Sequence, residues 1–115
     1  PMTYWQFLVN MKSRGLQDRV VPIVNTSAEG AILLKAAEVV ADIIYVDASH
    51  TFRAAYQDIC DYWPLLRKGG VMLVDDLTTY PDVYAAMLRF VAEQGLWGRF
   101  ESLDNNTFGL LTKPL

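Results

Sequence analysis

The chain has 115 residues, of which 52% are hydrophobic and 20% are charged, and its formal net charge is −3. These values predict a soluble globular chain with one domain over residues 1–115. The acidic balance and the scattered basic residues argue against nucleic acid as the main partner. No apolar stretch approaches the ~18 residues of a membrane span, so we expect no membrane partner either.

The single cysteine, Cys60, cannot form a disulfide within the chain, and no second cysteine stands near it to complete a metal site. An unpaired thiol is typical of a reducing setting, which predicts a cytoplasmic protein. Cys60 falls on the apolar face of a predicted helix, so we expect a buried structural thiol.

The first predicted element is a helix. Its apolar residues recur at helical spacing over residues 4–11, and Gly15 is placed to end it. The apolar run 20–24 predicts a short strand, in which Pro22 indicates an edge or a bulge.

A second helix follows, because Thr26 and Glu29 have the spacing of a capping box. Residues 43–46 form a continuous β-prone run, which predicts a strand covered on both faces, as in a parallel sheet. A third helix is predicted from Phe52, and we expect residues 65–70, with two basic residues and two glycines, to close it.

The last third of the chain repeats this alternation. Residues 71–74 predict another buried strand, and Pro81 suits the first turn of a helix that ends near Gly95. Residues 98–103 and 107–112 predict two antiparallel strands, because the Asp-Asn-Asn turn between them tolerates positive φ angles.

The predicted order is therefore α-β-α-β-α-β-α-β-β. Such alternation predicts an α/β fold, here a partial Rossmann-like doubly wound sheet. We expect the sheet to be mostly parallel with an antiparallel C-terminal strand, and to carry helices on both faces.

Three aspartates follow the two central strands of this prediction. Asp47 ends the run 43–46, and Asp75 and Asp76 end the run 71–74. Neighbouring parallel strands lie about 4.8 Å apart, and ligands of open α/β sheets bind at the carboxyl edge of the strands. Crowded carboxylates take up protons or a cation, and oxygen ligands favour Mg²⁺, Mn²⁺ or Ca²⁺. The alternative is that these aspartates are solvated and cap the following helices.

His50 is the only histidine of the chain, and it lies three residues after Asp47. An imidazole at this place could act as a general base or contact a cofactor. The alternative is a surface residue that caps the next helix.

The segment Ala41 to Leu77, ADIIYVDASHTFRAAYQDICDYWPLLRKGGVMLVDDL, carries the motif strand-Asp-x-x-His, helix, Leu-x-x-Gly-Gly, strand-Asp-Asp. It resembles the class I, Rossmann-like methyltransferases that use S-adenosylmethionine, and especially the metal-dependent branch that methylates oxygens of small molecules. The close resemblance covers about a third of the chain.

The resemblance implies site residues. In metal-dependent members the positions of Asp47, Asp75 and Asp76 hold one divalent cation, here most simply Mg²⁺. The resemblance also implies that Asp47 or His50 takes the proton of the acceptor. The implied contacts of the cofactor are Thr26, Ser27, Ala28, Asp47 and Ala48.

One part of the family pattern is missing. No glycine-rich loop follows an opening strand, and no acidic residue stands where a second strand would end. The chain therefore resembles the C-terminal two-thirds of a methyltransferase domain. The lost strands would leave the edge of strand 43–46 open, so we expect strand 20–24 to re-pair with it or a second copy to cover it in a homo-oligomer.

The sequence thus predicts an enzyme that transfers a methyl group from S-adenosylmethionine to a small molecule with the aid of a metal. The alternative is a truncated, non-catalytic fragment that folds and oligomerises through its open edge. A phosphoacceptor receiver domain also gathers aspartates, but there the acidic pair precedes the single aspartate, and the order here is reversed.

Overall fold

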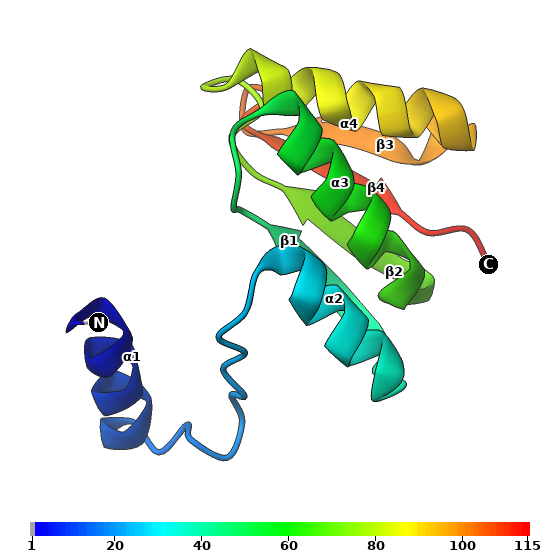
Figure 1. Ribbon diagram of the computed structural model, residues 1–115. Helices are drawn as coiled ribbons and strands as arrows, with labels where there is room; N and C mark the ends of the chain where they lie inside the picture. Colours follow the sequence, from blue (N-terminus) through cyan, green and yellow to red (C-terminus); the bar gives the residue numbers. More distant parts are fainter. Residues whose placement is uncertain (1) are drawn as a thin grey trace.

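A mixed four-stranded sheet lies at the centre of the computed structural model, which describes residues 2–115 (Figure 1). The helices are α1 (Met2–Ser13), α2 (Ser27–Ala36), α3 (Phe52–Tyr62) and α4 (Pro81–Gln94), and 3₁₀ turns cover Trp63–Leu65 and Trp97–Arg99. The strands are β1 (Ala41–Val46), β2 (Leu66–Val74), β3 (Phe100–Leu103) and β4 (Phe108–Thr112), in the order β1-β2-β4-β3. The predicted α/β class is confirmed.

The sheet is less parallel than the sequence predicts. Only β1 and β2 run parallel, whereas β2 pairs with β4 and β3 pairs with β4 in antiparallel fashion. The reason is that the predicted strand at 20–24 does not form. Pro22 has no amide hydrogen to donate, and Val21 is 83% exposed. The expected re-pairing of this segment with β1 is therefore wrong, and α2 follows α1 without a strand between them.

The end of α3 also differs from the prediction. Residues 66–70 do not close this helix but form the first half of β2. Gly69 has a φ of 77°, and its amide donates to the carbonyl of Lys113 at 2.9 Å. A Cβ on Gly70 would lie 2.9 Å from the carbonyl oxygen of Asp42. The two glycines thus allow a close approach of neighbouring strands, a use that the sequence does not distinguish from a helix C-terminus.

The local signals of the helices and of the hairpin are confirmed. The Thr26 side chain accepts from the Glu29 amide, and Glu29 accepts from the Thr26 amide, which completes the capping box. Pro81 opens α4, and Gly95 ends it in the left-handed conformation. The turn residues 104–106 all have positive φ angles. No helix within residues 2–115 is long and apolar enough to cross a membrane.

The core lies between the sheet and the helices α3 and α4. Its most buried side chains are Ile59, Met72, Val74, Leu77, Met87, Val91 and Leu111. Figure 1 shows α2, α3 and α4 side by side along one face of the sheet, with α1 standing away from it. Three of the four helices thus cover one face, and the expectation of helices on both faces remains a prediction. Cys60 is half-buried against this core, and its burial raises the pKa of the thiol.

Candidate functional site

The carboxyl ends of β1 and β2 bring three aspartates together. Val46 lies opposite Val74, and the amide of Asp75 donates to the carbonyl of Val46 at 3.0 Å. The first residues beyond the two strands are therefore neighbours. One carboxylate oxygen from each of Asp47, Asp75 and Asp76 lies within 4.8 Å of the others. The predicted gathering of these side chains, called the aspartate cluster below, is confirmed.

None of the three aspartates caps a helix. The N-cap of α3 is Thr51, whose side chain accepts from the amide of Ala54, and the N-cap of α4 is Tyr80. The alternative of aspartates that serve as helix caps is therefore wrong. His50 does not cap a helix either, because the N-cap of α3 is the next residue, Thr51.

Two hydrogen bonds hold the carboxylate of Asp75. The hydroxyl of Tyr45 donates to Oδ2, and the amide of Asp76 donates to Oδ1 at 2.7 Å. Tyr45 was not predicted as a site residue. The sequence feature that could have indicated its role is the alternation of side chains along β1, which places Tyr45 on the same face as Asp47.

His50 reaches the aspartate cluster from the loop after β1. Its Nε2 lies 3.2 Å from Oδ2 of Asp76. Its ring stacks on Tyr80, with ring centroids 3.6 Å apart and an angle of 3° between the planes. The structure thus brings together all four residues that the sequence assigned to metal binding and proton transfer. Their chemical roles remain predictions.

The pKa values of two residues in and beside the aspartate cluster are raised. Partial desolvation and the negative charges of Asp75 and Asp76 raise the pKa of Asp47. The hydrogen bond to Asp75, followed by desolvation and the nearby aspartates, raises the pKa of Tyr45 to about 12. Tyr45 therefore stays protonated at neutral pH and can act as a donor to Asp75.

The donor set fits a hard divalent cation. Two oxygens bound to one Ca²⁺ at about 2.3–2.6 Å are at most about 4.6–5.2 Å apart, and two oxygens bound to Mg²⁺ at about 2.1 Å are at most about 4.2 Å apart. The three oxygens here lie within 4.8 Å of one another, so they fall within the range for Ca²⁺, and Mg²⁺ would require the carboxylates to rotate slightly toward one another. Carboxylates are the ligands that Mg²⁺, Mn²⁺ and Ca²⁺ prefer. The residues present thus fit such an ion.

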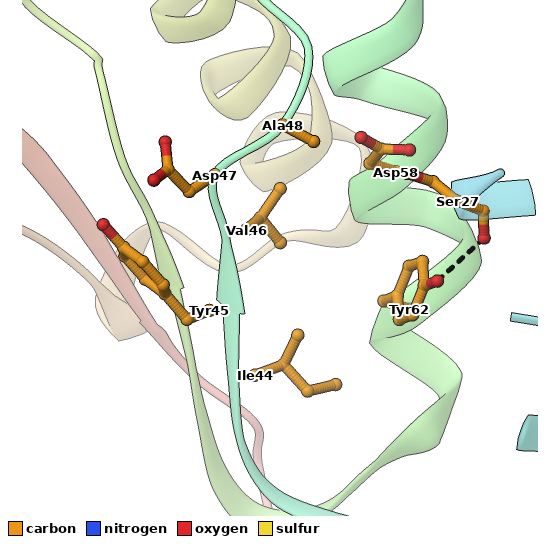
Figure 2. A pocket seen from close by; sticks show the side chains of 8 residues that line it. All are labelled: Ser27, Ile44, Tyr45, Val46, Asp47, Ala48, Asp58 and Tyr62. Atoms are coloured by element: carbon orange, nitrogen blue, oxygen red, sulfur yellow. Dashed lines mark hydrogen bonds between the residues drawn. The ribbon is translucent and has the colours of Figure 1, made fainter. Parts of the chain in front are cut away.

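A cavity of about 420 Å³ adjoins the aspartate cluster at the edge of β1 (Figure 2). Its lining consists of Ser27, Ile44, Tyr45, Val46, Asp47, Ala48, Asp58 and Tyr62. The volume is within the range of small-molecule sites. Of the residues predicted to contact a cofactor, Ser27, Asp47 and Ala48 line this cavity, whereas Thr26 caps α2 and Ala28 lines a different cavity.

Two lining residues from α3 were missed in the sequence. Tyr62 donates to the backbone carbonyl of Ser27 at 2.8 Å. Asp58 is only 8% exposed, and burial raises its pKa, while a hydrogen bond with Ser27 opposes this shift. The signal was an acidic residue at 58 on the helix face shared by Ala55 and Ile59, where an apolar residue is expected.

Comparisons with known proteins identify the family of the chain. A sequence model of a family described as "Methyltransferase domain" matches residues 2–77, which is more than half of the chain. The chain belongs to this methyltransferase family. The reversed order of the aspartates already spoke against a receiver domain, and the match overturns that alternative. Membership implies S-adenosylmethionine as the methyl donor.

A solved structure, the O-methyltransferase NovP, shares the fold of this methyltransferase chain. The two superpose with a TM-score of 0.56 at 13% sequence identity. The match covers 66% of this chain and 31% of NovP, so the chain spans about a third of that protein. Comparison with curated protein sequences gives no significant match.

Proposed function

We propose that this methyltransferase chain takes part in transfer of a methyl group from S-adenosylmethionine to an oxygen atom of a small molecule, with the aid of a divalent cation such as Mg²⁺. The observation that carries the proposal is that Asp47 belongs to two neighbouring features of the site. Its carboxylate belongs to the aspartate cluster, and the same residue lines the 420 Å³ cavity. A donor in the cavity and an acceptor at the cluster would meet there. An unpaired Cys60 suits the cytoplasm as the setting.

The proposed chemistry is a direct displacement. The acceptor oxygen forms a bond to the methyl carbon while the bond from that carbon to the sulfonium sulfur breaks. The proton of the acceptor hydroxyl goes to the carboxylate of Asp47 or to the imidazole of His50. A cation held by the aspartate cluster would lower the pKa of that hydroxyl. The remaining contribution of the chain is to hold both reactants in line.

Isothermal titration calorimetry with S-adenosylmethionine tests this proposal. We expect the 115-residue chain to bind S-adenosylmethionine with a micromolar Kd, because the cavity offers half-buried apolar side chains together with Asp47 and Asp58. Adenosine and methionine, titrated separately, serve as controls and should bind more weakly. If no heat of binding is detected at protein concentrations of hundreds of micromolar, the donor site is not in this chain.

We propose as a second candidate that the chain folds as a non-catalytic fragment and forms a homo-oligomer. The observation that favours it is the edge of β1, where Ile43 is 66% exposed and Tyr45 is 52% exposed. An exposed apolar edge strand is a template for pairing with another chain. The β1 edge of a second copy would provide hydrogen-bond partners for the unpaired backbone N–H and C=O groups of this edge.

The mass of the chain in solution tests this second candidate. We expect a dimer in sedimentation equilibrium, and we expect Ile43→Lys to shift the mass to that of a monomer, because a charge on an edge strand opposes pairing. Val9→Lys introduces the same charge on α1, where Val9 is also exposed, and should leave the mass unchanged. A monomeric wild-type chain at high concentration would rule this candidate out.

A further inference from the structure

The register of the sheet brings Tyr45 to the aspartate cluster. Tyr45 of β1 lies opposite Leu73 of β2, and Asp75 stands two residues further along the same face. A long aromatic side chain reaches such a diagonal neighbour. Figure 2 shows Tyr45 and Asp47 on one side of β1, with Ile44 and Val46 on the side that faces α3.

The contact fixes the orientation of the Asp75 carboxylate. Oδ2 accepts from the Tyr45 hydroxyl, and Oδ1 accepts from the amide of Asp76. With one donor on each oxygen, rotation of the carboxylate breaks at least one hydrogen bond. Each oxygen keeps a second lone pair, so the carboxylate is held in place and can still bind a cation.

The contact does not serve the core. The side chain of Tyr45 is 52% exposed and lies on the face of the sheet opposite α3, whereas the core residues of β1 are Ile44 and Val46. Removal of the hydroxyl would therefore leave the packing of the domain in place. A role in folding does not account for the position of this group.

We propose that Tyr45 is a positioning residue, whose hydroxyl holds Asp75 in the orientation needed for binding a divalent cation. The inference rests on the proposed function of the aspartate cluster as a cation site. Groups that hydrogen-bond a metal ligand from outside commonly set its geometry, and their loss typically costs about 10–100-fold in metal affinity. Asp76 has a comparable outer contact in His50.

Tyr45→Phe tests the inference, because it keeps the ring and removes only the hydroxyl. The probe is Mn²⁺, and the free ion is followed by electron paramagnetic resonance during titration of the whole chain. We expect the Kd for Mn²⁺ to rise about 10–100-fold in Tyr45→Phe, with an unchanged urea unfolding midpoint in the presence of EDTA. Tyr4→Phe makes the same chemical change on α1 and should leave both quantities unchanged.

The outcomes separate the inference from the proposed function. If wild type binds Mn²⁺ and Tyr45→Phe binds it within twofold of wild type, the positioning role is wrong and the cation site stands. If affinity and unfolding midpoint fall together, Tyr45 is a structural residue and the inference is again wrong. If wild type binds no Mn²⁺ at millimolar concentration, the cation site and the role of Tyr45 are both overturned.

Discussion

Asp47→Asn is expected to lower the affinity of the chain for Mn²⁺ by more than about 100-fold, since outer contacts of a metal ligand alone are worth about 10–100-fold. Asparagine has almost the same size but lacks the negative charge, and it leaves the cluster with two carboxylates. Asp47 is the best position for this change, because it is exposed and the hydrogen bonds that fix Asp75 do not involve it. Titration with Mn²⁺ under electron paramagnetic resonance gives the measurement.

A matched control and a second readout sharpen this test. Asp104→Asn removes one negative charge in the β3–β4 turn, where φ is 52° and asparagine is well tolerated, so the affinity for Mn²⁺ should not change. Without metal, Asp47→Asn should unfold at the same or a higher urea concentration than wild type, because it relieves repulsion among three carboxylates. An unchanged Kd for Mn²⁺ in Asp47→Asn would show that Asp47 is not a ligand.

The sequence predicts the parts of the fold that are decided by near neighbours. The capping box of Thr26 and Glu29, the proline and glycine at the ends of α4, and the turn at 104–106 are all local. Each depends on hydrogen bonds or φ angles within a few residues, so sequence patterns capture them. The aspartate cluster also requires the pairing of β1 with β2. It could still be predicted, because both strands are recognisable apolar runs that end directly in aspartates.

The errors lie where a distant partner decides the structure. Residues 20–24 have the composition of a strand, but a strand needs a neighbour to accept its hydrogen bonds, and none of the described strands pairs with this segment. Gly69 and Gly70 suit a helix end as well as a strand in close contact, and the decision comes from Lys113 and Asp42, far away in sequence. Local patterns do not contain these contacts.

The site residues also divide into those that a local sequence pattern reveals and those that depend on distant contacts. Asp47, Asp75, Asp76 and His50 stand in a recognisable motif, and the structure brings them together. Tyr45 and Asp58, by contrast, look in the sequence like ordinary members of a strand and a helix. Only the pairing of β1 with β2 directs Tyr45 to Asp75, and only the packing of α2 beside α3 buries Asp58 near Ser27.

Phe90→Ala is expected to destabilise the domain by about 3–5 kcal/mol. Phe90 of α4 is 2% exposed, and its ring meets Trp63 edge-to-face with centroids 5.5 Å apart. Truncation leaves a cavity where α4 packs against the turn after α3, and it also removes an aromatic pair worth about 0.5–1.5 kcal/mol. A domain of this size has a free energy of unfolding of about 5–15 kcal/mol, so the loss is a large part of the total. Urea unfolding followed by circular dichroism measures it.

Phe7→Ala is the matched control for this change. Phe7 lies on α1 and is 36% exposed, so the same truncation should alter the free energy of unfolding by at most about 0.5 kcal/mol. A loss below 1 kcal/mol in Phe90→Ala would mean that α4 does not pack on the sheet as described. Phe90 lies nine residues after Pro81, roughly 14 Å along the helix, so the folded variant should keep its affinity for Mn²⁺. Phe90→Ala therefore changes stability without changing cation affinity, and Asp47→Asn does the reverse, because the core fills the face of the sheet under α3 and α4 whereas the carboxylates of the aspartate cluster lie beyond the carboxyl ends of β1 and β2.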